Sequence, residues 1–246
     1  MQFRGWCFAV LWALAFNAAA QTQPLLIGAE DDWAPFSRAE NGQPVGMAVD
    51  IVRAIFGQAN IPVKLVPLPY ARCMLETKAG KLGGCFDTLP DAQMQRDYLF
   101  HAKPLFSDPL LIITRADSKD SAVKIQDLQG KRVLITHGYS YGDEFESNFL
   151  IQRVQSTSDL SNLRMLVAGR AEYSIVYRRI LGHQLRGKAR DLASQIKPVG
   201  QLPNALLYLS FSRSYPGIPD VIERFNEAHN RLLRDGTIAA ITKKWE

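Results

Sequence analysis

The sequence predicts a mixed α/β protein built from two lobes. Three observations support this fold class. Apolar strands and helices alternate over residues 24–88 in the order strand, helix, strand, helix, strand, which is typical of a parallel sheet. A second series of the same kind begins at residue 131. Two apolar runs, 109–115 and 204–211, are placed to carry the chain into a second lobe and back, and two such crossings form a hinge.

The elements of the first lobe follow from hydrophobic spacing and from turn residues. They are a strand at 24–29, a helix at 47–56, a strand at 62–66, a helix at 72–78, a buried strand at 83–86 and a short helical turn at 92–97. Asp91 is expected to cap that turn. Asp87 and Thr88 follow the buried strand, and open α/β sheets bind ligands just outside the carboxyl ends of their strands. This corner is therefore expected to face a ligand.

The second lobe and the return of the chain are predicted in the same way. The expected elements are a strand at 131–136, a helix that opens at 137–142 and runs to 149, a strand at 154–155, a helix capped by Ser158, a strand at 172–176, a helix from Tyr177, a strand at 204–211 and helices at 218–234 and 237–245. The predicted division is 21–107 with 206–246 for lobe 1 and 108–205 for lobe 2.

The first twenty residues have the pattern of a secretory signal peptide. One charge, Arg4, precedes an apolar run, and small residues end at Ala20, where cleavage is expected. The alternative, a membrane anchor, needs an apolar run of roughly 20 residues, and this one is shorter. The formal net charge of +5 falls to +4 when Arg4 is removed, which is too weak to argue for nucleic-acid binding.

Export leaves Cys73 and Cys85 in an oxidising compartment, where a disulfide between them is expected. The helix that carries Cys73 is predicted to begin beside the strand that carries Cys85, so the two sulfur atoms can meet. Two buried free thiols are the alternative, because the sequence does not give the Cα separation that a disulfide requires.

Catalytic and metal-binding motifs are absent from the sequence. The four histidines form no HxxxH or HxH pair and the cysteines form no CxxC, so neither a zinc site nor another metal site is expected. There is no Gly-x-Ser-x-Gly elbow and no glycine-rich phosphate loop, so no cofactor and no enzymatic activity are predicted. Acid–base work by scattered carboxylates such as Asp87 and Glu172 is the one catalytic chemistry left open.

Seven landmarks in order make the chain resemble a known family. They are WAPF at 33–36, GMAVDIV at 46–52, the segment from Pro90 and Asp91 to Phe100, LQGKRV at 128–133, GYS at 138–140, AGRAE at 168–172 and RDGT at 234–237. Each is weak alone, and their order and spacing together are specific. The chain is similar to the bacterial extracellular solute-binding proteins of family 3, the periplasmic binding proteins of amino-acid-type ABC importers.

This resemblance implies a type II periplasmic binding fold with mixed sheets and a cleft between the lobes. It also implies a periplasmic, monomeric protein whose partners are a small-molecule ligand and an inner-membrane ABC permease or a sensor protein. Members that bind amino acids grip the α-carboxylate with an arginine and the α-amino group with an aspartate. Met94 and Tyr177 occupy those positions here. The ligand is therefore expected to differ from an ordinary α-amino acid unless Arg72, Arg96 or Asp87 substitutes.

The expected cleft combines aromatic and polar side chains, a mixture that suits a ring or an amphipathic molecule. Gly138 to Tyr141 are predicted to open a helix whose free N–H groups hold an anion, although Ser140 is equally suited to capping that helix itself. The predicted ligand-binding residues are Trp33, Tyr70, Arg72, Asp87, Thr88, Arg96, Tyr139, Ser140, Tyr141 and Tyr177.

Two other functions remain open. The same fold hosts periplasmic cyclohexadienyl-type dehydratases, which would rely on a cleft carboxylate such as Asp87 or Glu172. It also hosts sensory domains, and a cleft that has lost its ligand can serve as a protein-interaction surface. The sequence favours a solute-binding protein over both.

Overall fold

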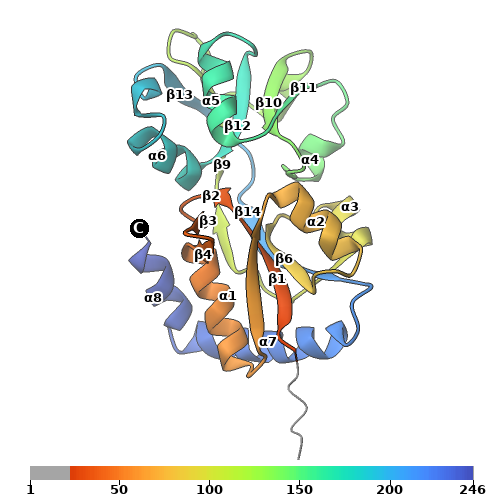
Figure 1. Ribbon diagram of the computed structural model, residues 1–246. Coiled ribbons are helices and arrows are strands. Elements are labelled where there is room, and N and C mark those ends of the chain that lie inside the picture. The colour runs from red at the N-terminus through yellow and green to blue at the C-terminus, as the bar shows by residue number, and fades with distance from the viewer. Residues whose placement is uncertain (1–22, 246) are drawn as a thin grey trace, which may run out of the picture.

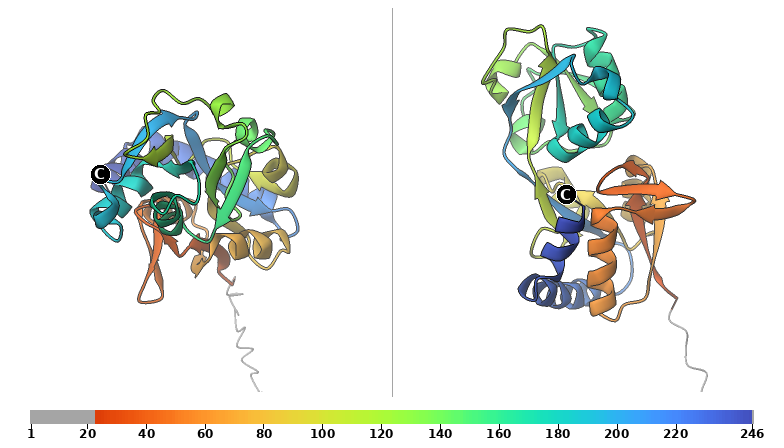
Figure 2. Two further views of the ribbon diagram at one scale, coloured as in Figure 1. Left: turned by 90° about the horizontal axis from the view of Figure 1, so that it is seen from above. Right: turned by 90° about the vertical axis from the view of Figure 1, so that its left-hand side faces the viewer.

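In the computed structural model, which describes residues 23–245, the chain forms two lobes joined by a narrow connection (Figure 1). Lobe 1 is the lower half of that view and lobe 2 the upper half. The predicted signal peptide and Ala20 lie outside the described residues. Seen from the side, two segments of the chain run between the lobes (Figure 2).

The sheet of lobe 1 is mixed, with strand order β5-β1-β6-β14-β7 and β8 paired to β14. Its strands are β1 (Leu25–Glu30), β5 (Val63–Leu68), β6 (Gly84–Thr88), β7 (Tyr98–Phe100), β8 (Phe106–Asp108) and β14 (Ala205–Ser212). Strand β1 runs parallel to β5 and β6, whereas β14 runs antiparallel to β6, β7 and β8. The parallel strands therefore end together at the edge that faces lobe 2.

The helices of lobe 1 are α1 (Met47–Gln58), α2 (Tyr70–Lys78), α3 (Ala92–Asp97), α7 (Ile218–Arg234) and α8 (Thr237–Lys244). Helix α1 buries the apolar residues whose spacing predicted it, and Phe56 packs edge-on against Phe225 of α7, with ring centroids 5.1 Å apart. The Asp91 side chain caps α3 by accepting a hydrogen bond of 2.7 Å from the Met94 amide, as expected.

Lobe 2 contains a second mixed sheet, with strand order β11-β10-β12-β9-β13. Its strands are β9 (Leu110–Arg115), β10 (Arg132–Thr136), β11 (Gln152–Ser156), β12 (Tyr173–Tyr177) and β13 (Ile196–Gln201). Its helices are α4 (Asp143–Glu146), α5 (Asp159–Val167) and α6 (Arg178–Arg186), with the 3-10 helices η1 (Ile125–Leu128) and η2 (Arg190–Leu192). Ser158 caps α5 through the Ser161 amide, as expected.

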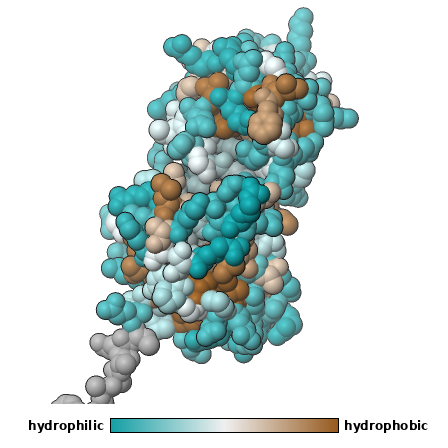
Figure 3. Space-filling model, turned by 90° about the vertical axis from the view of Figure 1, so that its right-hand side faces the viewer, coloured by the Kyte–Doolittle hydropathy of each residue, from teal (hydrophilic) through white to brown (hydrophobic). Residues whose placement is uncertain are grey.

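The chain crosses between the sheets twice, after β8 and before β14. The Leu202 amide donates to the carbonyl oxygen of Leu110, so the two crossing segments lie side by side. On the face drawn in Figure 3 the surface is mostly hydrophilic and the molecule narrows where the lobes meet. No helix among the described residues is long and apolar enough to span a membrane.

Three features differ from the sequence-based expectations. A small sheet of β2 (Asp32–Trp33), β3 (Ser37–Glu40) and β4 (Gln43–Val45) occupies a region predicted only as loop and turn. Strands β7, β8 and β13 were not predicted. Helix α4 is a single turn that begins at Asp143, so the helix expected to open at 137–142 and reach residue 149 is wrong.

A disulfide ties helix α2 to strand β6. Cys73 and Cys85 form a disulfide, with their Cα atoms 5.9 Å apart, so the expected bridge is confirmed over two free thiols. The bond fixes the start of α2 beside the carboxyl half of β6, so it holds Tyr70 and Asp87 in one rigid unit.

Candidate ligand-binding site

The carboxyl ends of strands from both sheets meet between the lobes and enclose a small space, which we call the inner cavity. Its volume is about 10 Å³. It is lined by Glu30, Trp33, Tyr70, Asp87, Leu89, Tyr139, Ser140 and Tyr177. Glu30 and Asp87 lie at the ends of β1 and β6, and Tyr177 ends β12 in the other lobe. Each lobe therefore supplies part of the wall.

A larger space of about 430 Å³, which we call the outer cavity, lies next to the inner one. Glu30, Tyr70 and Tyr139 line both and so stand between them. The remaining residues around the outer cavity are mainly of polar types, although the surface that faces the cavity is mostly apolar: Asp31, Asp32, Pro69, Ala71, Thr136, His137, Gln155, Ser156, Thr157 and Ser158. The pair of cavities together offers a small pocket and a roomier chamber with a mixed lining.

The lobes touch through specific contacts around these cavities. The Tyr139 hydroxyl of lobe 2 donates a hydrogen bond to Glu30 Oε1 of lobe 1. On one flank the Ala92 amide donates to Asp143 Oδ1 at 2.8 Å. Opening the lobes would break these bonds and join the inner cavity to solvent.

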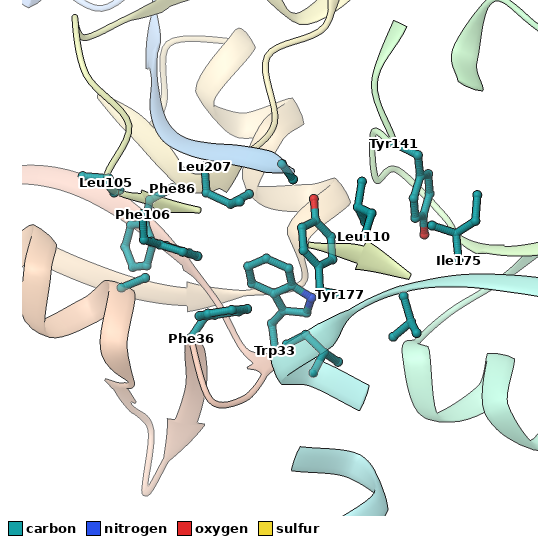
Figure 4. Packing of buried hydrophobic residues seen from close by; sticks show 14 of the residues in the cluster. Trp33, Phe36, Phe86, Leu105, Phe106, Leu110, Tyr141, Ile175, Tyr177 and Leu207 are labelled. Atoms are coloured by element: carbon teal, nitrogen blue, oxygen red, sulfur yellow. The ribbon is translucent and has the colours of Figure 1, made fainter. Parts of the chain in front are cut away.

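Aromatic rings from both lobes form the walls. Trp33 packs edge-on against Tyr177 with ring centroids 5.0 Å apart, and Figure 4 shows it lying between Phe36 and Tyr177. Tyr139 meets both Trp33 and Tyr70 edge-on, at 6.0 Å and 5.3 Å. The Trp33 indole N–H is buried, and its interaction with the Asp159 carboxyl lowers the pKa of that group.

Asp87 is the most unusual residue of the site. Only 5% of it is exposed, and neither carboxylate oxygen has a hydrogen-bond partner. Its φ of 73° lies in the left-handed region, which non-glycine residues seldom occupy, although aspartate does so more readily than most. Burial raises the pKa of the Asp87 carboxyl well above its ordinary value.

Two further carboxyl groups are buried at the same place. Desolvation raises the pKa of Glu30, and this outweighs the hydrogen bond from Tyr139 that lowers it; the Asp87 charge raises it further. Asp159, at the start of α5, has its pKa raised to about 7, again mainly by burial. The Thr136 hydroxyl donates to Asp159 Oδ1 at 3.2 Å and partly opposes that shift.

The titratable side chains of the site are therefore mainly acids. Among the described residues that line the inner and outer cavities there is no arginine and no lysine. The described part of the chain also has no group of three side chains arranged to hold a metal ion. A carboxylate ligand would meet acidic side chains here, whereas a cationic group would meet partners.

The structure brings together six of the predicted ligand-binding residues. Those that line the inner cavity are Trp33, Tyr70, Asp87, Tyr139, Ser140 and Tyr177. Thr88 and Tyr141 are buried behind the wall, where Thr88 accepts from the Tyr70 hydroxyl and Tyr141 accepts from the Thr136 amide.

The two predicted arginines lie elsewhere. Arg72 is exposed and pairs with Glu76 on its own helix at 2.8 Å. Arg96 is exposed and bonds to Gln93, at the rim of a separate surface cavity between α3 and α4. Neither lines the inner or the outer cavity, so neither replaces the missing carboxylate grip there.

The predicted anion site at Gly138 to Tyr141 is also wrong. Helix α4 starts after Gly142, and its only turn carries three acidic residues. One of them, Glu146, accepts the Tyr141 amide at 3.0 Å, and the Ser140 hydroxyl accepts the Gly142 amide at 3.3 Å. Two of the N–H groups in this segment, those of Tyr141 and Gly142, are therefore taken by side chains of the chain itself.

Sequence reasoning missed Glu30 and Asp159. Glu30 was placed just after the first strand, although it is the last residue of β1 and faces the cleft as Asp87 does. The sequence signal that could have identified Glu30 is that it lies at the end of its strand, as Asp87 lies at the end of another strand of the same alternating series. Asp159 follows a correctly predicted cap, and the sequence gave no sign of its burial.

Residues 25–246 match the family of bacterial extracellular solute-binding proteins, family 3. The chain belongs to this family. It is 21% identical to the probable amino-acid-binding protein YxeM of Bacillus subtilis, over 90% of the chain and 83% of that protein. It is 19% identical to the L-cystine-binding protein TcyJ of Escherichia coli, over 93% of the chain and 85% of that protein.

Solved structures show the same fold. A histidine kinase sensor domain with similarity to periplasmic binding proteins superposes with a TM-score of 0.78 at 21% identity, covering 91% of this chain and 96% of that one. An ancestral arginine-binding protein bound to arginine gives 0.74 at 20%, covering 90% and 97%. The chain is a solute-binding protein with the type II periplasmic binding fold, and the expected fold class is confirmed.

Proposed function

We propose that the protein is a periplasmic receptor that traps a small organic solute between its lobes and delivers it to an ABC importer. The observation that carries this proposal is the cleft itself. Side chains from both lobes line one small cavity, and the Tyr139 to Glu30 hydrogen bond links the lobes across it. A solute that fills this space contacts both lobes and so favours the closed arrangement over the open one.

The solute is proposed to differ from an ordinary α-amino acid, although several relatives and neighbours are named for binding amino acids. Met94 stands where the resembled binders place their carboxylate-gripping arginine. Arg72 and Arg96 lie outside the inner and outer cavities, and helix α4 begins at Asp143, after the segment from Gly138 to Tyr141 that was expected to hold an anion. The described lining thus offers an α-carboxylate no cationic partner.

Export and the partner follow from the same family membership and from the predicted signal peptide. The Cys73 to Cys85 disulfide suits an oxidising compartment such as the periplasm. The protein acts as a monomer and meets an inner-membrane permease in its closed form. A sensor partner is the second candidate, favoured by the likeness to the histidine kinase sensor domain.

An enzymatic role has weaker support. Glu172, one of the carboxylates expected to serve a dehydratase, lies on the surface of lobe 2 and pairs with Arg132 at 2.9 Å. Asp87 does face the inner cavity, so it is the remaining candidate for acid–base work. A binder and a dehydratase are distinguished by whether the solute leaves unchanged.

The test is a thermal-shift screen of residues 21–246, refolded to remove bound solute, against amino acids, amines, aromatic and dicarboxylic acids and small sugars. A solute that binds only the native state at a hundred times its Kd adds about 2.7 kcal/mol to the free energy of unfolding. We expect one chemical class to raise Tm, with one-to-one stoichiometry by calorimetry and no product by mass spectrometry. Absence of any shift would contradict solute capture, and product formation would establish the enzyme.

A further inference from the structure

Asp87 is a buried carboxylate that the folded chain leaves without a partner. Both of its oxygen atoms are buried, neither accepts a hydrogen bond, and the side chain lines the inner cavity. Buried polar groups are almost always hydrogen-bonded, and buried charges are paired, because an isolated one is costly. The left-handed backbone of Asp87 adds a second local cost. Because both the unpaired carboxylate and the left-handed backbone of Asp87 destabilise the solute-free protein, we interpret this cavity-lining side chain as a ligand-binding group.

Glu30 places a second carboxylate next to the first. Strands β1 and β6 are parallel, and Gly28 is paired with Cys85. Glu30 and Asp87 each lie two residues beyond that last paired position, both line the inner cavity, and the Asp87 charge raises the pKa of Glu30, so the two groups are close neighbours. Like charges placed side by side on neighbouring strands repel, and no described arginine or lysine lines this cavity to relieve that repulsion.

The rest of the lining suits a cation. Trp33, Tyr70 and Tyr177 place aromatic rings around the two carboxylates. Aromatic rings attract ammonium groups through their negative faces, most strongly where water is excluded. Among anionic, neutral and cationic ligand groups, a cation is the one that both the carboxylates and the aromatic rings stabilise.

The sizes of the two cavities narrow the class of cation. The inner cavity, at about 10 Å³, has the volume needed for about one water molecule. A primary ammonium group is of that size, whereas a trimethylammonium group is much larger. The outer cavity, at about 430 Å³, has hydroxyl and amide side chains such as Thr136, Gln155 and Ser156 for the remainder of a small molecule.

We propose that the solute is a primary amine without a carboxylate, with its ammonium group held between Asp87 and Glu30 and its remainder in the outer cavity. This inference rests on the proposed function, since it names the solute of the same cleft. The ammonium group has three N–H donors. Asp87 offers two free acceptor oxygens, and Glu30 offers a carboxylate of which Oε1 already accepts from Tyr139.

The test compares amines with the amino acids that differ from them by one carboxylate. Cadaverine is titrated against lysine and tyramine against tyrosine, by calorimetry on the refolded protein, with the trimethylammonium analogue of tyramine as a size control. We expect at least one amine to bind, its parent amino acid to bind at least about thirtyfold more weakly, and the trimethylated form to bind more weakly than tyramine. A parent amino acid that binds as tightly as its amine overturns the inference.

Asp87→Asn separates binding from folding, with Asp220→Asn, an exposed carboxylate of the same lobe, as the matched control. Loss of one partner of a buried charge pair is expected to weaken amine binding about thirtyfold or more. The Tm of the free Asp87→Asn protein should stay at or above that of the wild type, because an amide carries no charge to bury. Asp220→Asn should leave amine binding unchanged and lower Tm only slightly, because Asp220 lies in the first turn of α7, where a negative charge is favourable. Unweakened amine binding by Asp87→Asn overturns the inference.

The outcomes distinguish this inference from the proposed function. If only amino acids, acids or sugars bind, the protein captures a solute but the amine assignment is wrong. If no compound of the full screen binds, both are wrong.

Discussion

Replacing Asp159 with asparagine should change how the stability of the protein depends on pH. The Asp159 carboxyl is buried at the start of α5, and burial raises its pKa from 3.8 to about 7. In the unfolded chain the group titrates near 3.9. Between these values the folded state holds a proton that the unfolded state has released, so the free energy of unfolding falls as pH rises from about 4 to about 7.

The magnitude follows from the pKa. One pKa unit corresponds to about 1.4 kcal/mol, so the move from 3.8 to about 7 gives an upper bound of about 4 kcal/mol lost by the wild type over that range. Asparagine does not titrate, and this contribution disappears in Asp159→Asn. Glu30 and Asp87 also have raised pKa values and remain in both proteins. Because the Asp159 charge contributes to raising the Glu30 pKa, the difference between the two proteins reports Asp159 together with its coupling to Glu30.

The assay is urea denaturation of solute-free protein at intervals from pH 4 to pH 8. Asp191→Asn, an exposed carboxylate of the same lobe, is the matched control and should track the wild type. The stability of Asp159→Asn relative to the wild type should rise by up to about 4 kcal/mol between pH 4 and pH 7.5. Parallel pH profiles for Asp159→Asn and the wild type would refute the assigned burial and pKa of Asp159.

Two further predictions concern the rigid unit beside the cleft. Replacing both Cys73 and Cys85 with alanine should lower the free energy of unfolding by about 3 kcal/mol. The disulfide closes a loop with a sequence separation of 12, and without it the unfolded chain gains the conformational entropy that the closed loop had removed. Urea denaturation measures the change, and an unchanged midpoint would contradict the prediction. Gly28→Ala should destabilise by about 1–3 kcal/mol, because the added Cβ would lie 2.2 Å from Cys73 Sγ. Gly57→Ala, whose Cβ meets nothing within 4 Å, is the control and should be neutral or slightly stabilising; equal effects at the two glycines would argue against the packing described for α2.

The parts of the site that lie at strand ends could be predicted from the sequence. Apolar runs show where parallel strands stop, and the fold rule places ligands at their carboxyl ends. That reasoning found Asp87, Tyr70 and Tyr177, all of which line the inner cavity. It failed for Arg72, because position along the chain does not say which way a helical side chain points. The spacing of four residues to Glu76 was the available clue to a surface ion pair.

The irregular segments leave no periodic pattern in the sequence, which is why they could not be predicted. Helix α4 stays short because Gly142 adopts a φ of 91° just before it and Glu146 folds back to accept the Tyr141 amide, and neither leaves a periodic signal. Strand β3 has exposed polar residues and lacks the apolar alternation that identifies strands. Its pairing depends on neighbouring strands and not on its own sequence.

The central claim is that a solute binds between the lobes, and Trp33 offers a direct test. In residues 21–246 the tryptophans are Trp33, at the junction with Tyr177, and Trp245. The Trp245→Phe protein, refolded without solute, is titrated with the compound selected by the thermal-shift screen while Trp33 emission is recorded. The account predicts a saturable change with one-to-one stoichiometry and the Kd found by calorimetry. Binding seen by calorimetry with Trp33 emission unchanged would contradict a site between the lobes.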